Sequence, residues 1–137
     1  MKDLHVQFMT FCDYAMTSQE GKLSIIGIFD EVRVQQFPGG IASAALVAMI
    51  HGKPDTSYKL TIKGDKGAKN IFQPVELAIK TGMSGASHIT INLNNVGFPE
   101  AGEYRFVIQH EEKEIGHTIL KVMQAKQQNE LKYKLPN

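Results

Sequence analysis

The apolar residues of this 137-residue chain fall in short runs between turn residues, and no run has the spacing of a long amphipathic helix. The runs Tyr58–Lys63 and Val75–Lys80 alternate apolar and polar residues, which is the pattern of a strand with one buried face. Such runs recur every 10 to 16 residues, which predicts eight or nine strands. Because no helical crossover separates these runs, we expect the strands to be antiparallel.

The apolar content predicts how these strands are stacked. With 42% hydrophobic residues, the chain has enough apolar surface for two sheets to cover each other. We therefore predict an all-β, antiparallel two-sheet β-sandwich that is immunoglobulin-like or C2-like. The length fits one domain. Residues 1–123 are expected to form the sandwich, and residues 124–137 a polar spacer and a strand-like tail.

Three segments give more local predictions. His5–Ala15 and Lys22–Val34 flank a turn cluster and predict an opening β-hairpin. Ile41–Gly52 is rich in alanine, which favours a helix, but its short length and its flanks favour a strand buried on both faces, and we interpret it as a strand. Pro99–Tyr104 has the form Pro-x-x-Gly-x-Tyr, typical of sandwiches in which the tyrosine hydroxyl bonds back to the preceding loop. A plain turn before a half-buried Tyr104 is the alternative.

The tail is the segment that we expect to mediate contacts. After a polar spacer from Gln124, the residues Leu131, Tyr133 and Leu135 alternate with lysines, as in a strand. Such a segment can pair with an exposed sheet edge of its own chain or of a neighbour, so these three residues are the predicted partner-binding residues. A frayed terminus is the alternative.

The chemically reactive side chains do not form a catalytic or metal-binding motif. Cys12 lies within a strand without a neighbouring base, so we expect a buried small side chain and not a nucleophile. If Glu112 and Lys113 centre the last hairpin, His110 faces Ile115 and lies diagonal to His117, but zinc needs a third protein ligand. We therefore expect no catalytic residue, no metal and no cofactor.

Charge and cysteine content bear on partners and compartment. The net charge is +1, and no aromatic residues interleave with the lysines, so we expect no nucleic-acid partner. The most apolar window, Ile41–Ile50, is about half of what a bilayer requires, and the N-terminus lacks the apolar stretch of a signal peptide. The single cysteine fits a reducing compartment. We expect a cytoplasmic protein without a membrane segment.

The segments Phe11-Cys12-Asp13-Tyr14-Ala15, Gly21–Asp30 and Phe98–Phe106 carry a resemblance to a known group of proteins. The chain resembles an uncharacterised bacterial family that opens with a Cys-Asp-Tyr-Ala strand and a Gly-Lys-Leu-x-Ile-x-Gly hairpin, and closes with a Phe-Pro-x-x-Gly-x-Tyr-x-Phe strand. The resemblance covers about residues 6–122. It implies a small sandwich protein without an established activity, and it carries over no catalytic or ligand residue.

These observations lead to an unknown function, with a non-catalytic protein-interaction or self-associating module as the first hypothesis. The alternative is a small-ligand or carbohydrate-binding sandwich that uses the loops around Pro38-Gly39-Gly40 and Thr81–Ser87. The third possibility is an enzyme, which would need a cleft that joins His51 or His88 to carboxylates.

Overall fold

The computed structural model describes residues 4–125, which form ten strands and no helix. No helix in this range is therefore long and apolar enough to cross a membrane. In chain order the strands are β1 (His5–Thr17), β2 (Leu23–Phe29), β3 (Glu31–Val34), β4 (Gly39–His51), β5 (Ser57–Lys66), β6 (Lys69–Asn70), β7 (Val75–Lys80), β8 (Ala86–Phe98), β9 (Gly102–His110) and β10 (Lys113–Gln124).

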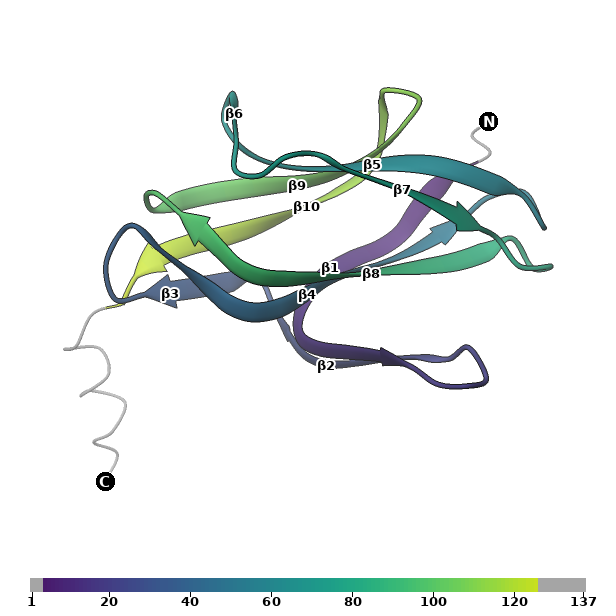
Figure 1. The fold of residues 1–137 in the computed structure, drawn as a ribbon, viewed down its shortest axis with the longest axis horizontal. Helices are drawn as coiled ribbons and strands as arrows, with labels where there is room; N and C mark the ends of the chain where they lie inside the picture. Colours follow the sequence, from purple (N-terminus) through teal and green to yellow (C-terminus); the bar gives the residue numbers. More distant parts are fainter. Residues whose placement is uncertain (1–3, 126–137) are drawn as a thin grey trace.

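The strands form two stacked sheets, which confirms the predicted all-β sandwich (Figure 1). One sheet has the order β2-β1-β4-β8, and the other has the order β3-β10-β9-β5-β6, with β7 also paired to β5. The expected number of strands is too low for two reasons. The segment Lys22–Val34 is divided at Asp30 into β2 and β3, which belong to different sheets, and β6 is a two-residue strand.

One strand pair departs from the antiparallel prediction. β3 and β10 run parallel, with Glu31 opposite Lys121 and Val34 opposite Gln124. A helical crossover is needed only where parallel strands follow each other closely in the sequence. β3 and β10 are instead joined by the six strands that lie between them in the chain, so no crossover is required.

β1 takes part in two surfaces because it bends after Cys12. Its first part pairs with β4 as far as Cys12, and its second part pairs with β2 alone. At the bend, Gly27 of β2 has a φ of 73°, and a Cβ at this position would collide with the Asp13 carboxylate. The β1–β2 hairpin therefore folds beneath β4 and β8 (Figure 1), where Thr17 Oγ1 and His88 Nε2 are hydrogen-bonded at 3.1 Å.

The folded-over hairpin buries the outer face of β4. Cys12, Ala45 and Val47 form a small buried cluster there, and Ala15, Leu23 and Ile25 of the hairpin pack against it. The other face of β4 contributes to the main core between the sheets. A strand buried on both faces needs apolar residues at successive positions, which is why the run Ala44–Ala48 is buried throughout. The strand interpretation of Ile41–Gly52 is thus confirmed.

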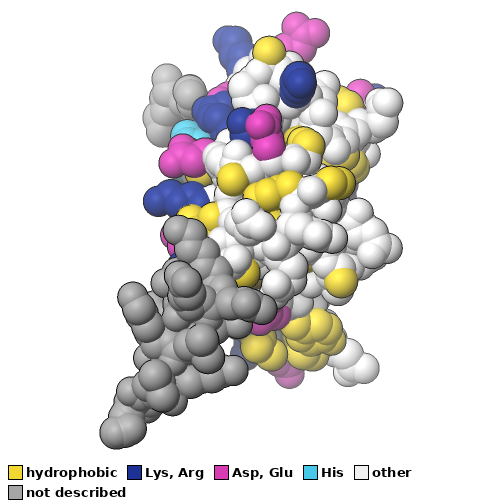
Figure 2. Space-filling view, turned by 90° about the vertical axis from the view of Figure 1, so that its left-hand side faces the viewer, with side chains coloured by type: hydrophobic (Ala, Val, Ile, Leu, Met, Phe, Trp, Pro, Cys, Tyr) yellow, Lys and Arg dark blue, Asp and Glu magenta, His cyan; other side chains and the backbone are white. Residues whose placement is uncertain are grey.

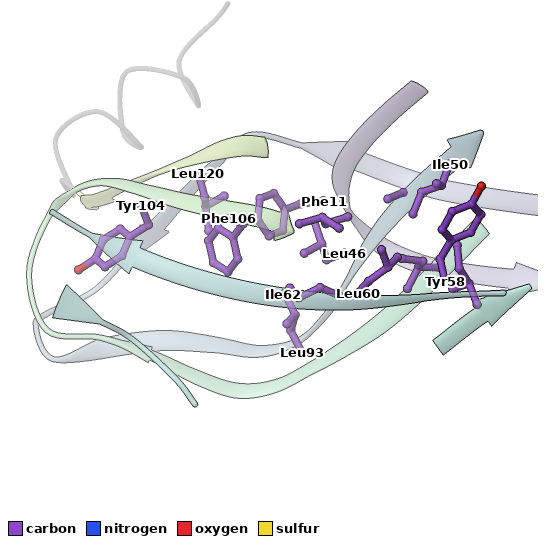
Figure 3. Close-up of a cluster of buried hydrophobic side chains, with 14 of the residues drawn as sticks. Phe11, Leu46, Ile50, Tyr58, Leu60, Ile62, Leu93, Tyr104, Phe106 and Leu120 are labelled. Atoms are coloured by element: carbon purple, nitrogen blue, oxygen red, sulfur yellow. The ribbon is translucent and has the colours of Figure 1, made fainter. Parts of the chain in front are cut away.

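The main core lies between the two sheets and is centred on aromatic and aliphatic side chains from both (Figure 3). Phe11 of β1 meets Phe106 of β9 edge-to-face, with ring centroids 4.8 Å apart, and it also stacks on Phe29 of β2. Edge-to-face pairs add about 0.5–1.5 kcal/mol beyond the burial of their surface. Phe11 therefore links the sheets at the position where β1 is about to bend.

β8 reverses the alternation of its side chains at Asn95. Leu93, Val96 and Phe98 all contribute to the main core, although a regular strand would place residues 93 and 96 on opposite faces. Asn95 has a φ of 57°, a left-handed conformation that asparagine tolerates better than most residues. This single residue keeps both halves of a 13-residue strand facing the core.

Tyr104 forms a tyrosine corner, the first of the two alternatives that the sequence leaves open. Its side chain is fully buried against Phe98, and its hydroxyl donates a 2.6 Å hydrogen bond to the Glu100 carbonyl oxygen. The Glu100 amide donates a longer bond of 3.4 Å back to the same hydroxyl. The loop between β8 and β9 is thereby fastened to the start of β9.

We expect Tyr104→Phe to lower the free energy of unfolding by about 1–3 kcal/mol, because the Glu100 carbonyl loses its buried donor. Chemical denaturation followed by circular dichroism measures this change. The matched control is Tyr14→Phe, whose side chain is 56% exposed and should show almost no effect. Equal stability of Tyr104→Phe and the original chain would contradict a structural role for the hydroxyl.

Candidate interaction surface

Four large apolar side chains of the β1–β2 hairpin are exposed, and we call them the hairpin surface. Tyr14 is 56% exposed and lies directly opposite Ile26, which is 58% exposed. Met16 and Ile28 are 46% and 66% exposed. Figure 2 shows hydrophobic side chains gathered in the lower part of the view. Because the two views share the vertical axis, this is the height at which Figure 1 shows β2. Single exposed apolar residues are ordinary, but adjacent ones on neighbouring strands indicate a contact surface.

The hairpin surface lies on an edge strand. β2 ends its sheet, so within residues 4–125 one row of its peptide N–H and C=O groups faces no neighbouring strand. Such edges accept additional strands unless they are blocked by charge, by a bulge or by a covering segment. The irregularity at Gly27 interrupts this edge in the middle of β2 and limits the length over which a partner can pair.

A shallow hollow, which we call the edge hollow, opens where β1 leaves β4. The pairing of β1 with β4 ends at Cys12 and Ala45, so in the described range Gly39–Ala44 has no strand partner on that side. β3 is also an edge strand and lies across this opening. The hollow has a volume of about 390 Å³, and its apolar lining is Ile28, Phe29, Val32 and Ile41.

The rim of the edge hollow carries negative charge. Asp13 and Glu31 line it together with the hydroxyl-bearing Ser43. The Glu31 carboxylate is bonded to the Nε of Arg33 at 2.8 Å, which offsets one of the two charges. The hollow thus combines an apolar floor with an acidic border.

The predicted partner-binding residues Leu131, Tyr133 and Leu135 lie outside the described residues. The described chain leaves β10 beside the end of β3, because the Gln124 side-chain amide donates to the Gln35 carbonyl and the Ala125 amide donates to the Val34 carbonyl. Sequence reasoning also missed the hairpin surface. The available signal was the run Ile25–Phe29, in which apolar residues occupy both faces of the expected opening hairpin.

The histidines are distributed over the molecule. His5 stacks on His51 with ring centroids 5.8 Å apart, and His88 bonds to Thr17 as described above. His110 meets Tyr58 edge-to-face and lies opposite Lys113, because the last hairpin turns at Glu111-Glu112. The expected pairing of His110 with Ile115 is therefore wrong: its partner is Lys113, two residues earlier. Between residues 4 and 125 no three His, Cys, Asp or Glu side chains are placed to hold a metal ion.

The two loops of the alternative ligand-binding hypothesis lie at opposite ends of the sandwich. Gly39 at the start of β4 pairs with Phe98, whereas His51 at its end pairs with Ala86. These ends are about 40 Å apart in an extended strand of this length. In the loop after β7, the amides of Thr81 and Gly82 donate to the carbonyls of Thr56 and Ala86, so both amides are engaged within the protein.

The Cys12 thiol is inaccessible. It is fully buried beneath the folded-over hairpin, and this burial raises its pKa. A hydrogen bond from the backbone of Tyr14 opposes the shift, and the nearby negative charge of Asp13 adds to it. A thiol held in its protonated form away from solvent is a poor nucleophile.

A charged group on the outer face of the second sheet joins β9 and β10. Arg105 donates to both carboxylate oxygens of Glu114, at 2.7 and 2.8 Å, and the ring of His117 bonds to the same carboxylate at 2.8 Å. The bond from Arg105 is the main reason why the pKa of Glu114 is lowered, and the bond to His117 contributes further. The group is partly exposed, so its contribution to stability is small.

The sandwich architecture together with the tyrosine corner defines an immunoglobulin-like β-sandwich. Residues 7–123, which include nearly all of the described strands, match a family of unknown function. The chain belongs to this family, DUF6941. This match confirms the expected membership of a family without an established activity.

The comparison with solved structures concerns the fold alone. The chain is similar to the GH3 beta-glucosidase of Bifidobacterium adolescentis, with a TM-score of 0.50 and 11% identity, over 87% of this chain and 17% of that chain. It therefore spans only a small part of that enzyme. An immunoglobulin-like protein from Pseudomonas aeruginosa is similar over 88% of this chain and 97% of its own, with a TM-score of 0.46 and 13% identity. No curated protein matches the sequence.

We expect Cys12 to be unreactive toward an aromatic disulfide reagent in native buffer, because the hairpin covers its thiol. Absorbance at the wavelength of the released thiolate measures the reaction. The rate should rise with denaturant in parallel with the unfolded fraction. A stoichiometric reaction within the mixing time in native buffer would show that the hairpin does not cover the outer face of β4.

We expect the pKa of Glu114, measured by carboxyl NMR titration, to lie below the usual value of a glutamate side chain and to rise in Arg105→Gln. His117→Gln should raise it less, since the bond from Arg105 is the larger cause. A lowered pKa stabilises the fold above the unfolded-state pKa, and this stabilisation disappears as the pH falls through the folded-state pKa. The stability difference between the original chain and Arg105→Gln should therefore shrink on acidification; a constant difference would contradict the assignment.

Proposed function

We propose that this protein is a non-catalytic interaction module that self-associates through the hairpin surface. The observation that carries the proposal is the group of four large, exposed apolar side chains on an edge hairpin. Ile28 is the most exposed of the four, at 66%. Contact with a second copy removes these side chains from water. Full burial of one isoleucine side chain is worth about 1.5–3 kcal/mol, so burying these partly exposed side chains favours association.

The placement of the chemically reactive groups supports a non-catalytic role. Cys12 is buried with a raised pKa, and His88 and His117 each bond to a neighbouring side chain on different parts of the sandwich. Catalysis requires a nucleophile or a base within hydrogen-bond reach of a partner group around a common substrate position. The hairpin surface offers apolar contact area and strand-edge peptide groups instead, which are the features of a protein-binding edge.

The test is the molar mass of the full chain over a series of concentrations, measured by size-exclusion chromatography with light scattering. We expect the mass to rise above the 15.2 kDa of one chain, and the double variant Ile26→Lys with Ile28→Lys to remain at the monomer mass. The matched control is Met83→Lys, because Met83 is 83% exposed on the connection between β7 and β8 and is not part of the hairpin.

Two results would overturn the proposal. The original chain could remain monomeric over the whole concentration series, or the double variant could associate as strongly as Met83→Lys. Circular dichroism of each variant verifies that the lysines have not unfolded the sandwich. Since both isoleucines are more than half exposed, we expect these substitutions to leave the fold intact.

A further inference from the structure

We propose that the edge hollow binds an extended segment of a partner protein in which apolar residues alternate with lysine or arginine. The segment adds as a strand to the part of β4 that β1 leaves without a neighbour. Binding at this place requires neither self-association nor the free edge of β2. The hollow is thus a contact site in addition to the hairpin surface of the proposed function.

The first feature that supports this site is the position in the sheet that β1 vacates. The pairing of β1 with β4 ends at Cys12 opposite Ala45, and within the described chain residues 41–44 continue without a strand on this side. Alternate residues of a strand direct their N–H and C=O groups to the same side, so part of these peptide groups face the hollow. Extended peptides bind such edges through main-chain hydrogen bonds.

The second feature is the shape of the hollow and its apolar floor. At one end β3 approaches β4 closely, since a Cβ at Gly39 would lie 3.0 Å from the Cβ of Val34. Beyond this end the hollow is lined by Phe29, Val32 and Ile41, which are partly buried and pack against the main core. Every second side chain of an added strand points to one face, so apolar residues at these positions would extend the main core.

The third feature is the charge of the border, which selects the chemistry of the partner. Among the described residues that line the hollow, Asp13 and Glu31 are acidic and none is a lysine, arginine or histidine. Arg33 offsets part of the charge of Glu31 through their 2.8 Å bond, but it does not line the hollow. The border therefore attracts basic residues and repels acidic ones, and the basic residues occupy the positions between the apolar ones.

The test is the binding of a synthetic peptide to the full chain, measured by fluorescence anisotropy. The probe is Val-Lys-Val-Lys-Val with blocked ends and a fluorophore attached through two glycines. Valine favours the extended conformation, in which five residues span about 16 Å. We expect a saturable rise in anisotropy with protein concentration at low ionic strength, and weaker binding as salt is added. The absence of a saturable rise would overturn the proposal.

Two N-methylated forms of the probe test strand addition. One carries N-methyl groups on its valines and the other on its lysines, so each lacks the N–H donors of one edge. Because only one edge of an added strand pairs with β4, we expect one form to bind at least about ten-fold more weakly and the other to bind nearly as well as the probe. Equal binding of the two forms would overturn strand addition.

Charge variants test the place and the chemistry of the contact. The peptide Val-Glu-Val-Glu-Val should bind at least about ten-fold more weakly than the probe. Ser43→Lys, at an exposed residue that lines the hollow, should weaken the probe roughly two- to five-fold through charge repulsion. The matched control is Ser24→Lys, at an exposed serine of β2 that does not line the hollow, and it should leave binding unchanged. Equal effects of the two lysines would place the peptide on the hairpin and overturn the proposal.

The molar mass of each sample separates this site from the proposed function, because the hollow and the hairpin surface share Ile28. A chain that stays monomeric and binds the probe with the pattern described would refute self-association and support the peptide site. A chain that associates through the hairpin surface but does not bind the probe would support self-association and refute the peptide site.

Discussion

The bend in β1 after Cys12 is the constraint on which the rest of this structure depends. Before the bend, β1 is an ordinary neighbour of β4; after it, the strand belongs only to the hairpin that crosses the outer face of its own sheet. Because peptide groups in a sheet need partners, a strand that leaves early exposes the edge of the strand it leaves. The buried outer cluster, the exposed hairpin surface and the edge hollow are all consequences of this departure.

The bend is held by packing on both sides. Phe11 sits immediately before it and contacts aromatic rings of β2 and β9, so this part of β1 is fixed in the main core. Immediately after it, Ala15 packs on the small cluster around Cys12 and Val47. A glycine at position 27 makes room for the Asp13 side chain between these two contacts. Small and large residues alternate here because two apolar surfaces meet within a few residues.

Much of the fold follows from local sequence patterns, whereas the candidate site depends on where regular patterns are interrupted. Alternation in Tyr58–Lys63 predicts a half-buried strand, and the continuous apolar run in β4 predicts a strand buried on both faces. Gly27 and Asn95 both have positive φ values, and Asn95 reverses the side-chain alternation of β8. Glycine and asparagine also occur in regular strands, so the residue types alone do not predict such an interruption. The parallel pairing of β3 with β10 depends on packing between distant segments, which local propensity does not contain.

The pairing of β3 with β10 also sets an order for assembly during synthesis. β3 is made early, yet its partner is the last strand of the described chain. Non-local pairings of this kind are slow to form because the intervening chain must first be brought together. Until β10 has been synthesised, the edge of β3 with which it pairs therefore stays open. In this interval the open edge can pair with other chains, and the interval ends only when β10 pairs with β3.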